Sequence, residues 1–173
     1  TTGSMPIFVL WANAEIEGVA EFSVPDETSW NLDVKQAAGD EIRKGVVVDP
    51  DEAHEVPNSK NASASFMVRF AGDTKFSYLK VLRPGEEGCP KTLTFRAQTA
   101  EDGEELVPIF ACECRGMEPI GWTPIGPYTV VAEKGAIYEI GFRNDEDWCD
   151  YDEGSDKPLS VGKDIRYEWR LHR

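Results

Sequence analysis

The stretch Ile165–His172 (IRYEWRLH) alternates large apolar side chains with polar ones at every position. A period of two places the apolar set on one face of a β-strand and the polar set on the other, so this stretch predicts a strand with one buried and one wet side. The same period recurs along the rest of the chain, in the segments Ile7–Ile16, Trp30–Lys35, Arg43–Val48, Ser63–Phe70, Phe76–Leu82, Thr92–Gln98, Leu106–Cys114, Tyr128–Ala132 and Ala136–Arg143.

Short turn sequences separate these segments. Proline, glycine and aspartate gather in them, as in Val24-Pro25-Asp26, Asp49-Pro50-Asp51 and Arg83-Pro84-Gly85. About ten strands joined by short turns predict an all-β fold, an antiparallel sandwich or barrel-like architecture with little helix. No segment keeps a helical apolar stripe over several turns, and Gln36–Lys44 is the best candidate for a short helix.

The chain length favours one domain. A chain of 173 residues can build a hydrophobic core without disulfides or metals. We expect a single domain over residues 5–173, preceded by Thr1–Ser4, which resemble a tag scar before Met5. The segment Arg83–Pro90 (RPGEEGCP) is the most linker-like point and marks two possible sub-halves.

The charge of the chain restricts its partners and compartment. Its 18 Lys and Arg face 32 Asp and Glu, a net charge of −14. A phosphate binder needs a basic face, so neither nucleic acid nor an anionic membrane is expected, and a basic protein partner fits better. Ile7–Ala12 is too short to span a bilayer and lacks the features of a signal peptide, and four cysteines are too few for a disulfide framework. A cytoplasmic protein is expected.

The sequence offers little for catalysis. His54 lies in an acidic segment and His172 is the penultimate residue, and these are the two histidines of the chain. A nucleophile–histidine arrangement needs a histidine oriented by a third group. The nucleophile-elbow, P-loop and dinucleotide-binding glycine motifs are absent. We therefore predict that the protein is not an enzyme, and a carboxylate-dependent hydrolase is the least favoured alternative.

Two features offer metal ligands. The segment Asp145–Asp156 (DEDWCDYDEGSD) holds seven carboxylates, but its spacing does not match an EF-hand, and a solvated loop is the simpler interpretation. Its aromatic residues, Trp148 and Tyr151, are either anchors to the body or a recognition surface. Cys112 and Cys114 fall on one strand face and are expected to be packing thiols. The alternative is a relocated metal site built from Cys112, Cys114, Cys149, His54 and residues 145–156.

Two motifs resemble a known family. Phe110–Pro119 (FACECRGMEP) and Asp147–Glu153 (DWCDYDE) are similar to segments of the eukaryotic CXXC-motif-containing zinc-binding protein family. Ser160-Val161-Gly162 before a final strand and Ser63-Ala64-Ser65 upstream fit the same resemblance. It implies a small all-β protein without an established reaction, in which two Cys-x-x-Cys pairs hold one zinc ion.

The resemblance also implies a departure from the family. The ligand positions fall at Gln36 and Gly39, with a possible slip of one residue, and at Phe70 and Asp73, and no cysteine precedes Cys89. We therefore expect a zinc-less relative without a cofactor, in which the two turns pack on each other and Asp73 pairs with Lys35 or Lys75. The matched motifs define a possible partner surface, made of Arg115, Gly116, Glu118 and Pro119 with Trp148, Asp150, Tyr151, Asp152 and Glu153; alternatively, Arg115 pairs with a carboxylate of the acidic segment and is structural.

Overall fold

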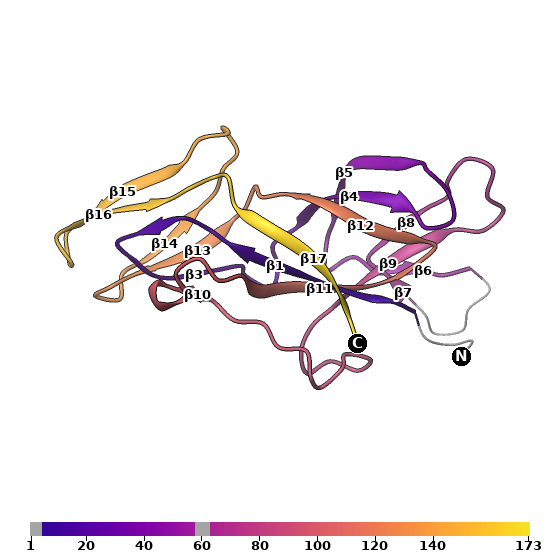
Figure 1. Cartoon of the computed structure of the whole chain (residues 1–173), viewed down its shortest axis with the longest axis horizontal. Coiled ribbons are helices and arrows are strands. Elements are labelled where there is room, and N and C mark those ends of the chain that lie inside the picture. Colours follow the sequence, from indigo (N-terminus) through magenta and orange to yellow (C-terminus); the bar gives the residue numbers. More distant parts are fainter. Residues whose placement is uncertain (1–4, 58–62) are drawn as a thin grey trace.

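The computed structural model describes residues 5–57 and 63–173, which form an all-β, sandwich-like fold (Figure 1). The predicted fold class is confirmed, and every strand pair is antiparallel. These residues contain 17 strands, several of them very short, and a single 3-10 turn at Ala100–Asp102. The sheets all have two free edges, so the described part of the chain forms no closed barrel. Thr1–Ser4, interpreted from the sequence as a tag scar, lie outside the described residues.

The largest sheet has five strands in the order β17-β1-β11-β9-β8. Their bounds are Arg166–His172, Ile7–Asn13, Val107–Arg115, Ser77–Leu82 and Phe66–Val68. β1 lies between β11 and β17, with Ile7 opposite both Glu113 and His172. The predicted alternation of β17 holds for Trp169, which packs inward, and for Tyr167, which packs on Trp122 although its side chain is partly exposed; Leu171 is exposed.

Three smaller sheets and a short hairpin complete the fold. One sheet has the order β10-β3-β13-β14, with strands Gln98–Thr99, Val19–Ser23, Tyr128–Ala132 and Ile137–Ile140. The next has the order β12-β4-β5, with strands Met117–Thr123, Trp30–Gln36 and Ile42–Val48. The last has the order β15-β16-β2, with strands Trp148–Asp152, Lys157–Val161 and Ile16–Glu17. β6 (His54–Glu55) pairs with β7 (Ser63–Ala64).

All four larger sheets combine strands from both sides of Arg83–Pro90. The two sub-halves considered from the sequence therefore do not form separate sheets. An aromatic cluster joins the layers at the centre of the core. The ring centroids of Trp30 and Phe110 lie 4.2 Å apart. The ring of Trp122 lies 5.9 Å from that of Trp30, and the ring of Trp169 lies 6.0 Å from that of Phe110.

Three expectations about local structure were wrong. Gln36–Lys44 is not a helix: β4 ends at Gln36, β5 begins at Ile42, and the Gln36 N–H donates to the Glu41 carbonyl across a tight turn at 2.9 Å. The acidic segment is only partly a loop, because Trp148–Asp152 form β15 and pair with β16, whereas residues 145–147 and 153–156 are in no strand. Most of Thr92–Gln98 is irregular, since only Gln98 joins a strand.

Candidate functional site

The two turns to which the resemblance assigns the family's ligand positions lie against each other. The Gln36 side chain, at the end of β4, donates from Nε2 to Oδ2 of Asp73 at 3.0 Å. Asp73 in turn closes its own turn by donating from its backbone N–H to the Phe70 carbonyl at 3.1 Å. On the other side, the Gly39 N–H donates to the Gln36 carbonyl at 3.4 Å. The structure thus brings Gln36, Gly39, Phe70 and Asp73 into one cluster, which we call the turn cluster.

A second contact crosses the turn cluster. The Glu41 carboxylate accepts a hydrogen bond from the Ala71 N–H at 3.0 Å and also pairs with Arg43. The Ala71 N–H and then the Arg43 guanidinium lower the pKa of Glu41. Phe70 is 1% exposed and belongs to the main core, with the Arg43 guanidinium 5.6 Å from its ring centroid. The sequence pattern did not indicate Glu41 or Arg43, because neither falls on a motif position.

The Arg115–Pro119 motif packs beside the turn cluster. The Gly116 carbonyl accepts from the Ala37 N–H at 3.0 Å and from the Ser77 hydroxyl at 3.2 Å. Gly116 has φ of +77°, and a Cβ there would lie 2.4 Å from Ser77 Oγ, so glycine is required on both grounds. Glu118 and Pro119 continue into β12, where they pair with β4. This motif therefore holds the β11–β12 turn against the first of the two ligand-position turns.

The acidic motif divides into anchors and exposed residues. Asp152 is 2% exposed and accepts from the Ser155 hydroxyl and N–H and from the Tyr138 hydroxyl, the last at 2.7 Å. Ser155 first, and then Tyr138, lower the pKa of Asp152. Trp148 packs on Tyr138, with ring centroids 5.6 Å apart. In contrast, Asp150, Tyr151 and Glu153 are exposed. Of the residues expected to form a partner surface on this hairpin, these three are the ones open to solvent.

The two matched motifs do not form one surface. Figure 1 shows β15 and β16 at the left end of the molecule and the turn between β11 and β12 toward the right end. The expected ion pair between Arg115 and the acidic segment is therefore not formed, because the β11–β12 turn extends away from that hairpin. Asp73 likewise pairs with Gln36 and not with Lys35 or Lys75.

The residues of the alternative metal site are dispersed. Cys112 and Cys114 are fully buried in the core, with their sulfurs 3.8 Å apart, whereas Cys149 is exposed on β15. Burial raises the pKa of the Cys112 thiol well above its ordinary value. His54 is exposed and pairs with Glu52 at 2.9 Å. Within residues 5–57 and 63–173, no three His, Cys, Asp or Glu side chains come together as metal ligands would.

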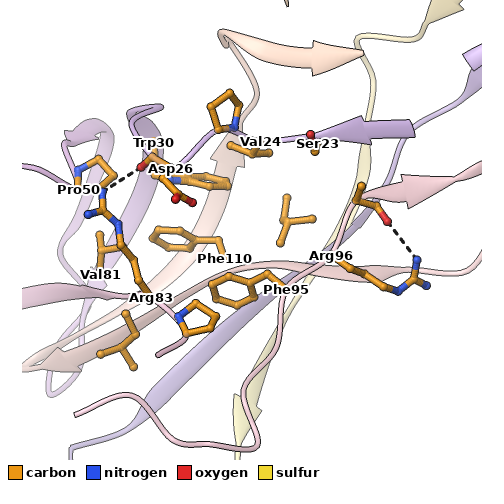
Figure 2. Close-up of a pocket in the computed structure, with 15 residues that line it drawn as sticks. Ser23, Val24, Asp26, Trp30, Pro50, Val81, Arg83, Phe95, Arg96 and Phe110 are labelled. Atoms are coloured by element: carbon orange, nitrogen blue, oxygen red, sulfur yellow. Dashed lines mark hydrogen bonds between the residues drawn. The ribbon is translucent and has the colours of Figure 1, made fainter. Parts of the chain in front are cut away.

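A cavity of about 250 Å³ is a feature that the sequence did not indicate. Figure 2 shows its aromatic wall, formed by Trp30, Phe95 and Phe110, which come from β4, the irregular segment after Pro90, and β11. Asp26 and Arg83 lie at its edge. Of the three wall residues, Trp30 and Phe110 lie on strands and Phe95 does not. Segments distant in the sequence meet here, so no local motif could have signalled the cavity.

Comparison with known proteins identifies the same family as the motifs. Residues 9–170 match the family model described as "CXXC motif containing zinc binding protein, eukaryotic". The chain belongs to this family. The CXXC motif containing zinc binding protein of Mus musculus is 32% identical over 69 residues, which cover 39% of this chain and 43% of that protein. The UPF0587 protein C2D10.03c of Schizosaccharomyces pombe is 26% identical over 96% of this chain and 98% of its own length.

Two solved structures share the fold of this member of the zinc-binding family. A hypothetical protein from Plasmodium falciparum superposes with a TM-score of 0.78 at 24% identity, over 95% of this chain and 99% of that one. The protein C1orf123 superposes with a TM-score of 0.79 at 21% identity, over 96% and 99%. In the described part of this CXXC-family chain, no helix has the length and apolar character needed to cross a bilayer.

The residues of the turn cluster do not fit the zinc of the family name. Four thiolates suit zinc, whereas the cluster offers an amide, a glycine without a side chain, a phenyl ring and one carboxylate. The amide and the carboxylate are already hydrogen-bonded to each other, and the phenyl ring of Phe70 is packed in the core.

Proposed function

We propose that this chain is a non-enzymatic binding or scaffold protein of the cytoplasm, which folds without the zinc of its family and takes a basic protein partner on an acidic lobe. The acidic lobe is defined as residues 14–24 and 128–165, which contain β2, β3 and β13 to β16. Figure 1 shows these strands together at the left end of the molecule.

The observation that carries the proposal is the concentration of charge in this lobe. Its residues include 13 carboxylates and four Lys or Arg, a net charge of −9 out of −14 for the chain. A field of one sign attracts a partner of the opposite sign and raises the association rate. The family resemblance supports a binding role over a reaction, because it brings no catalytic arrangement with it.

Exposed apolar side chains lie within the acidic lobe. Tyr151 is 50% exposed on β15, and Ile137 is 73% exposed on the edge strand β14. Tyrosine is among the residues that contribute most to protein interfaces, because its ring covers a large area at low entropic cost. Charge would therefore guide the partner to the hairpin, and Tyr151 would supply a contact within it.

The zinc-free part of the proposal rests on the turn cluster. Its two turns are joined by the bond from Gln36 to Asp73 and by the bond from Ala71 to Glu41. A structural zinc site supplies about 10–16 kcal/mol of apparent binding free energy, which these bonds do not equal. The buried core, including Phe70, supplies the remainder.

Metal analysis tests this part. We expect the purified protein to contain no stoichiometric zinc and to keep its melting temperature in the presence of a strong chelator. A variant with cysteine at positions 36, 39, 70 and 73 is the matched control, since it restores the ligand set of the family and should gain one zinc ion that the chelator removes. Stoichiometric zinc in the unmodified protein, or a chelator-dependent melting temperature, would refute zinc-free folding.

Titration with a lysine-rich peptide tests the partner surface. Binding should weaken as salt rises, because the Debye length falls from about 10 Å at 0.1 M to about 3 Å at 1 M. Asp150→Asn with Glu153→Gln should weaken binding. The control Asp40→Asn with Glu55→Gln removes the same charge from exposed positions outside the lobe and should have a smaller effect. Equal effects of the two pairs would argue against a localised surface.

A further inference from the structure

The cavity of Figure 2 lies largely outside the acidic lobe, and different residue types line it. Apolar side chains make up the larger part of its lining, where Trp30, Phe95 and Phe110 are joined by Val24 and Ile109, and the polar part includes Asp26, Arg83 and Arg96. At about 250 Å³ it is somewhat smaller than the usual range for drug-sized ligands, so it suits a compact molecule with a single ring or a short branched chain.

Three loops form the rim of the cavity, and Arg83 holds them together. Its guanidinium donates to the Asp26 carbonyl at 3.0 Å, pairs with Asp51 at 3.2 Å and lies 3.8 Å from Glu86. Asp26 follows β3, Asp51 follows β5 and Glu86 follows β9, so one side chain fixes the ends of three strands. A rim fixed before binding lowers the entropic cost of holding a ligand.

The charge of the rim is negative. Exposed carboxylates occur in pairs on its three loops, at Asp26 and Glu27, at Asp51 and Glu52, and at Glu86 and Glu87. Arg83 neutralises only part of this charge, because it pairs with two of the six carboxylates, Asp51 and Glu86, and Arg96 is paired with Asp102 outside the rim. Figure 2 shows Arg96 directed away from the aromatic wall.

Asp26 is the acidic residue best placed for a ligand. It lines the cavity together with Trp30 and Phe110, and Figure 2 draws its side chain near both. Its backbone carbonyl accepts from Arg83, but its carboxylate makes no hydrogen bond or ion pair with any other residue that the structure describes. An unpaired carboxylate beside aromatic rings suits a cation, which both groups attract.

We propose that this cavity binds a small organic cation, with an apolar body against Trp30, Phe95 and Phe110 and an ammonium group beside the Asp26 carboxylate. Anions are disfavoured by the rim and by the charge of the whole chain. A neutral apolar molecule would fill the interior but leave Asp26 without a partner. The proposal is independent of the acidic lobe, which contributes only Ser23 and Val24 to the lining.

Three probes of similar shape test the proposal with the intact protein: 2-phenylethylammonium, 2-phenylethanol and 3-phenylpropanoate. Affinities are measured by titration followed in amide NMR spectra, which also locate the site. The ammonium probe should bind about fivefold more tightly than the alcohol and shift the amides of Asp26, Trp30 and Phe110, whereas the propanoate should bind more weakly than either.

Asp26→Asn removes the charge while keeping the shape. This variant should lower the affinity for the ammonium probe about fivefold and leave the affinity for the alcohol unchanged. The neighbouring Glu27, which does not line the cavity, provides the control: Glu27→Gln should change neither affinity. Equal binding of ammonium and alcohol, an unchanged affinity in Asp26→Asn, or tightest binding of the propanoate would each overturn the proposal.

A competition experiment identifies the source of the cation. If the lysine-rich peptide displaces 2-phenylethylammonium from the unmodified protein but less well from Asp26→Asn, the cation belongs to a side chain of a partner protein. If the peptide binds the acidic lobe without displacing the probe, the ligand is a free amine. Either outcome supports recognition of a cation, and failure of the acidic lobe to bind the peptide leaves the test of the cavity intact.

Discussion

Phe70 and Asp73 illustrate how single residues take over positions that the family resemblance assigns to zinc ligands. The phenyl ring of Phe70 is buried, while Asp73 reaches across to Gln36. The four positions were assigned from the family resemblance, and the structure brings the two turns that carry them together. The sequence did not predict the partner of Asp73, because opposite charge favours Lys35 or Lys75, whereas the observed partner is the amide of Gln36.

The bond between Gln36 and Asp73 should be measurable as a coupling energy. We expect Gln36→Ala and Asp73→Ala to be non-additive by about 1 kcal/mol in the free energy of unfolding, because a partly buried hydrogen bond joins them. Denaturant unfolding of the two single variants and the double variant gives this value. Gln36→Ala combined with Asp40→Ala should be additive, and full additivity of the first pair would contradict the bond.

Asp102 should give the protein part of its acid sensitivity. The Arg96 side chain, followed by the Thr99 N–H, lowers the pKa of Asp102 to about 2. The unfolded value is about 3.9, so this stabilisation is complete above about pH 4 and is lost as the pH falls toward 2. Asp102→Asn should lower the free energy of unfolding by about 1 kcal/mol at pH 7. This value is smaller than the pKa shift alone would give, because Arg96 is half exposed and solvent screens the pair.

Unfolding curves between pH 2 and 7 test this linkage. The difference in stability between the unmodified protein and Asp102→Asn should shrink as the pH approaches 2. The neighbouring exposed Glu101→Gln should show no such trend. A difference that stays constant with pH would show that the Asp102 carboxylate is not stabilised in its charged form.

At the scale of elements, most strands with alternating sequences were predicted, although Thr92–Gln98 is largely irregular, and two strands with unusual compositions were missed. β12 contains Pro119 and Gly121, residues that normally interrupt strands, and its register shifts between them where it pairs with β4. β15 has a composition typical of a solvated loop, yet it pairs along its full length with β16. In both cases a neighbouring strand, distant or adjacent in sequence, decided the conformation.

The position of the cysteines on their strands sets their reactivity. Cys149 on β15 is exposed and should react with an alkylating reagent in the native protein, and half-buried Cys89 should react slowly because burial raises its pKa. Cys112 and Cys114 are fully buried in β11 and should react only after denaturation. Mass spectrometry after timed alkylation, with and without denaturant, distinguishes the groups. Rapid native modification of Cys112 or Cys114 would instead favour accessible thiols, as the alternative metal site requires.

For the whole molecule, composition and periodicity predicted the fold class but not the arrangement of the sheets. Each larger sheet combines strands from both sides of Arg83–Pro90, and such long-range pairing has no local signal. The cavity of Figure 2 was unpredictable for the same reason, since its wall is assembled from separate segments. The segregation of charge into one lobe also appears only once the strands are placed.

Because each larger sheet combines strands from both sides of Arg83–Pro90, we expect that neither part of the chain folds alone. In a fragment of residues 1–86, β1 lacks both of its neighbours, β11 and β17, because these belong to the second part. A fragment of residues 87–173 lacks β1, β9 and β4, which pair with its strands. Amide NMR spectra of each fragment should show the narrow dispersion of unfolded chains, and a well-dispersed spectrum from either one would contradict this expectation.

The pairing of Ile7 with His172 brings the first and last long strands side by side at one corner of the sandwich. Adjacent antiparallel strands lie about 5 Å apart, so a peptide bridge of a few residues could join these two strands covalently. Circular permutants opened at a distant turn, such as the one at Ala132–Gly135, would then keep every sheet intact. The same corner is a poor place for two bulky fusion partners at once, since they would crowd each other.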